Sequence, residues 1–110
     1  MLFCQNMMTG EKIRGKENKI MQKLQNGSGT LNVYVIAICE GEDLFEIYNA
    51  GILKQRGLRK LPIRIAGLAS SPEEAQDMIT GWIMEHLNLD NPEILKQKSL
   101  DYFAPMRKKP

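Results

Sequence analysis

Residues 31–48 read LNVYVIAICEGEDLFEIY, and the conformation of their second half decides the fold. The first half, residues 31–40, alternates its side chains between two faces that are both apolar. One face carries Val33, Val35, Ala37 and Cys39, and the other carries Tyr34, Ile36 and Ile38. Because a strand that is apolar on both faces must be covered on both, this pattern predicts a central strand of a sheet.

The second half of this stretch has two interpretations. In the first, residues 44–48 return as a second strand and pair with residues 31–40 across a glycine-containing turn at residues 40–43. A short helical turn over residues 51–56 then follows the hairpin.

The competing interpretation is a helix that begins at Asp43, with Glu46 completing a capping box, and that ends at Gly57. Asn49 and Gly51 would lie in the middle of that helix, where both residue types are unfavourable. We therefore favour the hairpin.

A third strand is expected over residues 61–68, where three large apolar side chains share one face: Leu61, Ile63 and Ile65. Pro62 has no backbone N–H to donate to a neighbouring strand, so this strand is expected to lie at an edge of the sheet or to begin at Pro62. Gly67 indicates either the end of the strand or a close approach of another backbone.

The clearest helix follows over residues 71–87. Ser71 provides the N-cap, Pro72 occupies the first helical position and Glu74 completes a capping box. Apolar residues repeat along it at spacings of three and four: Ala75, Met78, Ile79, Trp82, Ile83 and Leu87. Such a stripe predicts a helix that covers one face of the sheet.

These elements predict an α+β fold. It contains a small, mostly antiparallel sheet, made of the hairpin and the third strand, with an amphipathic helix on one face. The alternative is a β-α-β-α unit in which parallel strands are joined by a right-handed crossover.

We expect one domain over residues 31–95. A weakly ordered basic arm over residues 1–30 precedes it, and a basic tail over residues 96–110 follows it. Within the arm, a short helix over residues 17–25 would place three apolar side chains on one face: Ile20, Met21 and Leu24.

Composition sets broad limits on the class of protein. The chain has 110 residues, of which 43% are hydrophobic and 25% charged, as in an ordinary single globular domain. No stretch approaches the roughly 20 apolar residues of a membrane span, and the N-terminus lacks the pattern of a signal peptide. The two cysteines, Cys4 and Cys39, match neither a disulfide framework nor a metal site. We therefore expect a cytoplasmic protein with no membrane partner and no cofactor.

Charge alternates in blocks along the chain, although the net charge is only +2. The most basic block, residues 51–64, contains five basic and no acidic residues: Lys54, Arg56, Arg59, Lys60 and Arg64. Because clustered cations can contact phosphates, this block is the candidate site for an anion or a nucleic acid. It contains no aromatic residue for base stacking, and the acidic blocks on both sides could neutralise it within the fold.

Candidate catalytic groups are few. His86 is the single histidine, and it adjoins the apolar stripe near the end of its helix, where a structural role is expected. Cys39 lies in an apolar strand, which does not favour a reactive thiolate. The acidic turn at residues 40–43 matches no calcium loop, and residues 67–71 match no phosphate-binding loop. We therefore expect no catalytic residue and no metal site, and predict that the protein is not an enzyme.

Two segments carry a resemblance to known proteins. Residues 65–69, IAGLA, precede a helix that opens with residues 73–75, EEA. Residues 32–48 lie before an Arg/Lys-rich connector at residues 56–60. In this arrangement the chain resembles short uncharacterised bacterial α+β proteins, a family of unknown function, over about residues 31–85. The resemblance implies the hairpin and no activity.

The leading expectation is a non-enzymatic accessory or protein-interaction domain, because a well-specified fold comes without a catalytic or cofactor motif. A three-stranded sheet with one helix leaves a second face or an edge free, which favours a protein partner or a homo-oligomer. The first alternative is a nucleic-acid-associated protein that uses residues 54–64. The second is an enzyme of unknown class, which would need a pocket that brings His86 or Cys39 next to an acidic group.

Overall fold

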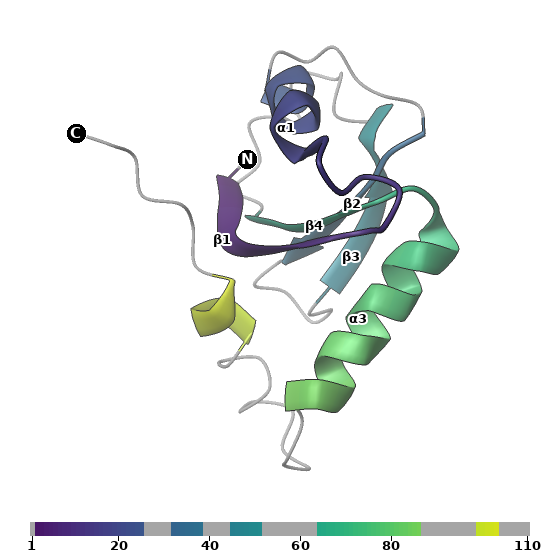
Figure 1. The fold of residues 1–110 in the computed structure, drawn as a ribbon. Helices are drawn as coiled ribbons and strands as arrows, with labels where there is room; N and C mark the ends of the chain where they lie inside the picture. The colour runs from purple at the N-terminus through teal and green to yellow at the C-terminus, as the bar shows by residue number, and fades with distance from the viewer. Residues whose placement is uncertain (1, 26–31, 39–44, 52–63, 87–98, 104–110) are drawn as a thin grey trace, which may run out of the picture.

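The computed structural model describes residues 2–25, 32–38, 45–51, 64–86 and 99–103. The helices and strands in chain order are β1 (Leu2–Thr9), α1 (Glu17–Gln25), β2 (Tyr34–Ile38), β3 (Phe45–Asn49), β4 (Arg64–Ala69) and α3 (Pro72–His86). Figure 1 shows the strands as one layer with α1 and α3 on opposite sides of it. Within the described ranges, neither helix is long and apolar enough to cross a bilayer.

The described strands form one mixed sheet in the order β1-β4-β2-β3. Strand β2 pairs with both β3 and β4 in antiparallel orientation, whereas β1 pairs with β4 in parallel. The pairing of β2 with β3 runs from Tyr34 opposite Asn49 to Ile38 opposite Phe45. The α+β class, the hairpin and the central position of the first predicted strand are therefore confirmed, and the sheet is mostly antiparallel.

The helical interpretation of residues 43–57 is wrong for the part that the structure describes, because Phe45–Asn49 is a strand. Its side chains alternate: Phe45 and Ile47 pack on the α3 side of the sheet, and Tyr48 packs on the α1 side. This two-residue period is that of a strand. The expected helical turn begins at residues 50–51, directly after β3, and residues 52–56 lie outside the described residues.

The expected edge position of the third strand is wrong. Strand β4 lies between β1 and β2, because Leu2–Thr9 pairs with its outer side as a fourth strand. Residues 61–63 lie outside the described residues, so the alternative expectation, a strand that begins at Pro62, stays a prediction.

The structure corrects the prediction of a weakly ordered arm over residues 1–30. Leu2–Thr9 belongs to the sheet, and α1 spans the residues that the apolar spacing indicated. Ile20 and Leu24 of α1 are buried. The physical reason is that β2 is apolar on both faces, so the face opposite α3 also has to be covered. The fold therefore includes residues well before residue 31.

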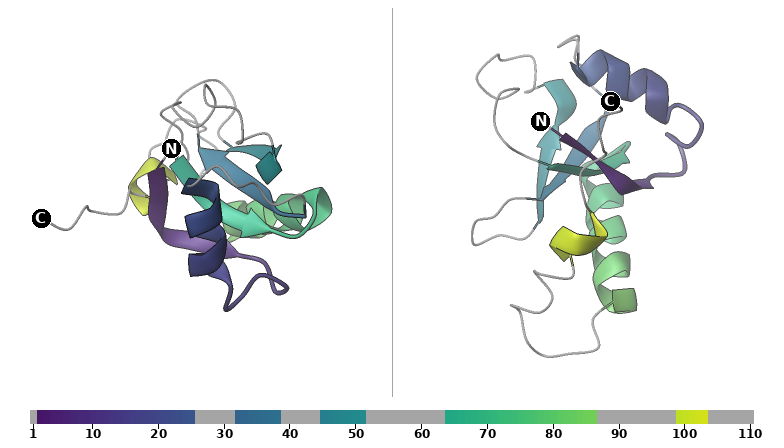
Figure 2. Two further views of the ribbon diagram at one scale, coloured as in Figure 1. Left: turned by 90° about the horizontal axis from the view of Figure 1, so that it is seen from above. Right: turned by 90° about the vertical axis from the view of Figure 1, so that its left-hand side faces the viewer.

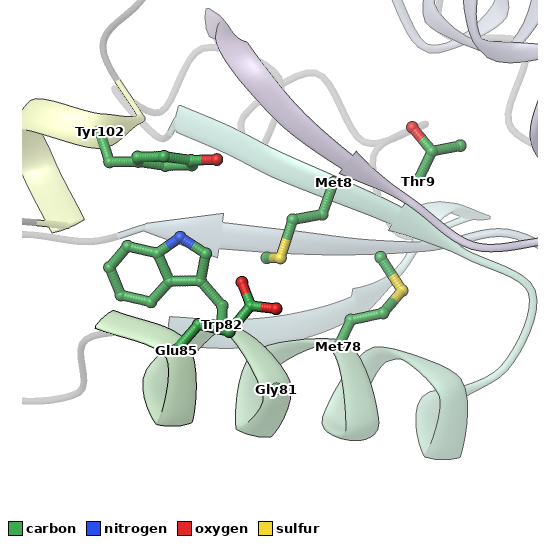
Figure 3. A pocket seen from close by; sticks show the side chains of 7 residues that line it. All are labelled: Met8, Thr9, Met78, Gly81, Trp82, Glu85 and Tyr102. Carbon is green, nitrogen blue, oxygen red and sulfur yellow. The ribbon is translucent and has the colours of Figure 1, made fainter. Parts of the chain in front are cut away.

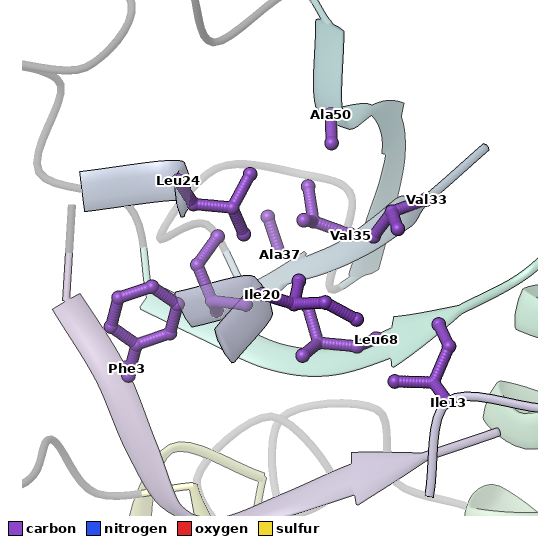
Figure 4. Close-up of a cluster of buried hydrophobic side chains, with 10 residues drawn as sticks. Phe3, Ile13, Ile20, Leu24, Val33, Val35, Ala37, Ala50 and Leu68 are labelled. Carbon is purple, nitrogen blue, oxygen red and sulfur yellow. The ribbon is translucent and has the colours of Figure 1, made fainter. Parts of the chain in front are cut away.

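Helix α1 closes a hydrophobic cluster on its side of the sheet (Figure 4). The cluster contains Phe3, Ile13, Ile20, Leu24, Val33, Val35, Ala37, Ala50, Ile65 and Leu68. Its members come from β1, α1, β2 and β4. Segments from the start of the chain and from residues 64–69 therefore contribute to one core. The free second sheet face expected from the sequence is absent among the described residues.

The opposite face of the sheet is covered by α3 and by a helical turn over residues 99–103 (Figure 2). The buried members of this second cluster are Cys4, Ile36, Ile38, Ala66, Ala69, Ala75, Ile79, Trp82 and Phe103. The predicted apolar stripe of α3 is thus confirmed as the element that covers one face. Part of the tail predicted over residues 96–110 also belongs to the fold, because Ser99 and Phe103 are buried.

The predicted cap of α3 is present. The Ser71 Oγ accepts a hydrogen bond from the Glu74 N–H at 3.0 Å. The Glu74 carboxylate reaches back and accepts from the Ser70 N–H at 2.8 Å and the Ser70 hydroxyl at 3.1 Å. The first bond satisfies the Glu74 N–H, one of the donors that the first helical turn leaves without an intrahelical partner, and the other two hold Ser70, the residue before the cap, against the helix.

Gly67 lies at a close approach between β4 and its neighbours. The β2–β4 pairing shifts between Ile36, opposite Gly67, and Ala37, opposite Ile65, so Ala66 is the extra residue of a bulge. A Cβ atom added at Gly67 would lie 3.0 Å from the Ile36 Cδ1 and 3.3 Å from the Met8 carbonyl oxygen. The close-approach interpretation of this glycine is confirmed.

We predict that Leu24→Ala lowers the free energy of unfolding by about 2–5 kcal/mol, because it empties a fully buried position of the core. The exposed neighbour Gln22 provides the control, and Gln22→Ala is expected to change stability by less than about 0.5 kcal/mol. Urea unfolding followed by circular dichroism measures both. Equal stability of the two variants would contradict the place of α1 in the core.

We also predict that Gly67→Ala destabilises the fold by about 1–3 kcal/mol, the usual cost of an overpacked site. The added methyl group meets the backbone of Met8, which cannot move without shifting β1 away from β4. Thermal unfolding of the variant and the wild type checks this. A stability gain, as expected for an unhindered glycine, would contradict the close approach.

Candidate functional site

The basic run predicted as an anion or nucleic-acid site falls mostly outside the described residues. Lys54, Arg56, Arg59 and Lys60 all lie there, so a shared basic surface stays a prediction. Arg64 is half-buried at the start of β4, and its Nη1 donates a hydrogen bond to the Leu100 carbonyl oxygen at 3.1 Å. This guanidinium therefore holds the 99–103 turn to the sheet.

His86 packs as a structural residue, as its position beside the apolar stripe indicated. Its ring stacks on Trp82 with centroids 4.4 Å apart and an angle of 18°. The Nδ1 atom lies 2.9 Å from the Trp82 carbonyl oxygen. Since a carbonyl oxygen only accepts, this contact is a hydrogen bond when the proton is on Nδ1.

Cys39 lies outside the described residues, whereas Cys4 is fully buried in the cluster beneath α3. Burial raises the pKa of the Cys4 thiol to about 11, and the positive charge of Arg64 offsets part of that rise. A thiol in this state has little thiolate at neutral pH. Cys4 is therefore a core residue and a poor nucleophile.

The candidate site is an open groove at the sheet edge formed by β1, with a volume of about 290 Å³. It runs between the end of β1, one flank of α3 and the 99–103 turn. Figure 3 shows its lining. The lining residues are Met8, Thr9, Met78, Gly81, Trp82, Glu85 and Tyr102.

Three parts of the chain that are far apart in sequence build this groove. Met8 descends from β1 toward the helix, and Met78 rises from α3 toward the strand (Figure 3). Tyr102 belongs to the 99–103 turn, which is anchored to β1 by the Asn6 Nδ2, a donor to the Tyr102 carbonyl oxygen at 2.9 Å. The buried Phe103 holds the turn in the core beneath. The walls are therefore fixed by packing, while two methionine side chains line the space.

The lining residues of α3 lie on one flank of the helix. Met78, Gly81, Trp82 and Glu85 are spaced by three or four residues, which places them one above another. Met78 and Trp82 belong to the apolar stripe that covers the sheet, whereas Gly81 and Glu85 lie beside it and are exposed. The sequence pattern predicted the buried stripe of α3. It could not show that the groove lies along one side of this stripe.

Trp82 forms the inner wall of the groove and the centre of an aromatic cluster. Its ring centroid lies 5.2 Å from that of Phe103, 5.5 Å from that of Tyr102 and 5.8 Å from that of Phe45. The Phe45 contact is edge-to-face, an arrangement that the ring quadrupoles favour. The side chain is only 5% exposed. Trp82 is therefore held rigidly from several sides.

The indole N–H of Trp82 is buried and has no hydrogen-bond partner among the described residues. A buried donor without an acceptor costs roughly 1–3 kcal/mol, and buried Trp side chains usually find a partner. Trp82 also lines the groove, so a ligand in the groove would lie against the residue that carries this donor. Met8 and Met78, which line the groove with it, are unbranched and adaptable side chains.

One acidic side chain lines the groove, and the described residues form no metal site. Glu85 is exposed and lines the groove, and no ion pair of this residue is formed within the described ranges. No group of three or more His, Cys, Asp or Glu side chains is gathered among the described residues. The groove therefore offers apolar contact, a buried donor and one carboxylate.

No family model, curated protein or solved structure matches this chain in the comparisons. The resemblance to short bacterial α+β proteins accordingly stays a prediction, and the groove is interpreted from its own geometry.

The buried position of Cys4 leads to a prediction about its reactivity. In a Cys39→Ala background, alkylation by iodoacetamide at pH 8 should be at least about 100-fold slower in the native protein than in urea. Two pKa units separate the buried thiol, at about 11, from the ordinary value of 9.0, and each unit is tenfold in thiolate.

The same shift predicts that stability falls at high pH. Since the folded pKa is raised, the stabilisation is present below about pH 9 and is lost as the pH rises toward 11. Urea unfolding from pH 8 to 11 should show a steeper loss in the wild type than in Cys4→Ala. Equal alkylation rates in the native and unfolded states would contradict the burial of this thiol.

Proposed function

We propose that this protein is a non-enzymatic accessory or protein-interaction domain that binds a partner protein in the groove between β1 and α3. The observation that carries the proposal is the buried N–H of Trp82, a residue that lines an apolar groove, which has no hydrogen-bond partner within the described ranges. A bound partner would supply the missing acceptor. A cytoplasmic location, expected from the sequence, is part of this proposal.

The size of the groove favours one side chain over a cofactor. Its volume of about 290 Å³ lies at the lower limit of the ~300–1,000 Å³ that sites for drug-sized ligands occupy. A single large apolar side chain fits such a space together with the backbone on either side of it. This supports a protein segment as the ligand.

The chemistry of the lining supports the same conclusion. Methionine is flexible and polarisable, and it recurs on surfaces that adapt to different partners. Rigid aromatic walls beside adaptable methionines provide a fixed pocket with a lining that can change its shape. Tryptophan and tyrosine are also the residue types that most often dominate binding energy at interfaces.

Both faces of the described sheet are covered, so neither face is free for a second copy of the chain to bind. Because α1 covers the face that the sequence left free, a bare sheet face does not support a homo-oligomer. We therefore place the docking site at the groove. Of the candidate basic run, the structure describes Arg64 alone, and its guanidinium is used to hold the 99–103 turn.

The proposal is tested by selecting binders from a displayed library of random 12-residue peptides. Trp82 is the only tryptophan, so the protein has a single indole N–H signal in a ¹⁵N–¹H spectrum. We expect selected peptides to shift this signal and to lose about two- to tenfold in affinity on Trp82→Phe, which removes one hydrogen-bond donor. Fluorescence anisotropy of labelled peptides measures the affinity.

Met84→Ser provides the matched control, because Met84 is 76% exposed on α3 and does not line the groove. Its affinity for the selected peptides should equal that of the wild type. Circular dichroism of Trp82→Phe establishes that the variant is folded. Peptides that bind Trp82→Phe as well as wild type, and leave the indole signal in place, would overturn the groove as the docking site.

A further inference from the structure

The charge of the side chains around the groove indicates which kind of ligand the groove would bind. Helix α3 carries four acidic residues and no lysine or arginine: Glu73, Glu74, Asp77 and Glu85. Glu74 is engaged in the helix cap, and Glu73 and Asp77 do not line the groove. Glu85 therefore stands at the groove as an exposed carboxylate. Charge complementarity favours a cation opposite it.

Gly81 leaves the helix backbone open at the middle of the groove. An added Cβ atom would have no neighbour within 4 Å, so nothing in the described fold excludes a side chain there. Glycine inside an exposed helix costs about 0.8–1.0 kcal/mol relative to alanine. Gly81 lowers stability, and no packing contact requires a glycine there. A ligand backbone that passes close to the helix at this point would require it, because glycine has no side chain in the way.

The rise of α3 sets the distance between Gly81, where a ligand backbone can pass, and the carboxylate-bearing residue Glu85. The two residues are four positions apart, which at ~1.5 Å per residue is about 6 Å. In an extended segment, side chains two positions apart point to the same side and are separated by about 6.6 Å. The two spacings agree closely enough for one extended segment to engage both positions.

We propose that the groove binds an extended segment of a partner protein in which a lysine or arginine lies two positions from a large apolar residue. The inference rests on the proposed function. The apolar side chain enters between Met8, Met78 and Trp82, and a backbone carbonyl accepts from the Trp82 N–H. The cation lies beside the Glu85 carboxylate, while the segment's backbone passes Gly81.

The test uses acetylated, amidated tripeptides titrated against the full chain while the Trp82 indole signal is followed. The active probes are Leu-Ser-Arg and its reverse, Arg-Ser-Leu, because the direction of the segment is open. Leu-Ser-Gln and Gln-Ser-Leu remove the charge. Leu-Arg-Ser has the composition of the active probe but places the cation on the opposite side of an extended chain.

One of the two active probes should shift the indole signal and bind about two- to fivefold more tightly than its glutamine analogue, the range expected for an exposed ion pair. Leu-Arg-Ser should lack this advantage. Glu85→Gln should abolish the preference for arginine. Asp77→Asn, which removes one charge from the same helix away from the groove, should retain it.

Gly81→Ala separates binding from folding. The variant should be as stable as the wild type or more stable, because alanine is the better helix residue and no described atom opposes the added methyl group. It should nevertheless bind the active probe at least threefold more weakly, since the methyl group meets the segment's backbone. Unchanged binding by Gly81→Ala would overturn the close approach of a backbone at this position.

The outcomes distinguish this inference from the proposed function. If library-selected peptides bind at Trp82 but show no preference for a cation two positions from an apolar residue, the present inference fails and the proposed function stands. If no selected peptide binds at Trp82, both fail. If the indole signal shifts with protein concentration alone and sedimentation shows a dimer, the occupant is a second copy, and the proposed segment is wrong.

Discussion

The need to bury both faces of strand β2 is the constraint on which the rest of this structure depends. Val35, Ile36 and Ala37 are fully buried and their side chains alternate between the two faces. A strand that is apolar on both sides cannot lie at an edge or on an open sheet, because apolar surface left in water forfeits about 25 cal/mol per Å². Neighbouring strands and two helical layers therefore have to surround it.

This constraint explains why the N-terminal residues belong to the fold. Helix α3 can cover only one face of the sheet, so a second amphipathic segment is required on the other. Helix α1 supplies it with Ile20 and Leu24, and the chain that leads to α1 adds Leu2–Thr9 as an edge strand. The parallel pairing of β1 with β4 is thus a consequence of covering β2, because it brings α1 across the open face.

The groove arises where three of these covering elements meet without filling the space between them. The end of β1, the flank of α3 and the 99–103 turn are each held by their own contacts, and methionine side chains line what remains. Two features of this place lower stability: a buried indole N–H that meets no acceptor in the part of the chain that the structure describes, and a glycine on the exposed side of a helix. Local conflicts with the rules of a stable fold are expected to gather at functional sites.

The sequence by itself determined the local structure. Alternation of apolar residues identified β2, the capping residues and the apolar stripe identified α3, and the spacing of Ile20 and Leu24 indicated α1, because each pattern reflects the period of its own backbone. For β3 the pattern left a strand and a helix open, and the unfavourable helix residues Asn49 and Gly51 favoured the strand. Tertiary structure alone decided the inner position of β4 and the strand at Leu2–Thr9, whose residues lack regular alternation and pair only because β4 offers an edge. It also decided the groove, since Met8, Trp82 and Tyr102 are brought together by packing between distant segments, which no local period records.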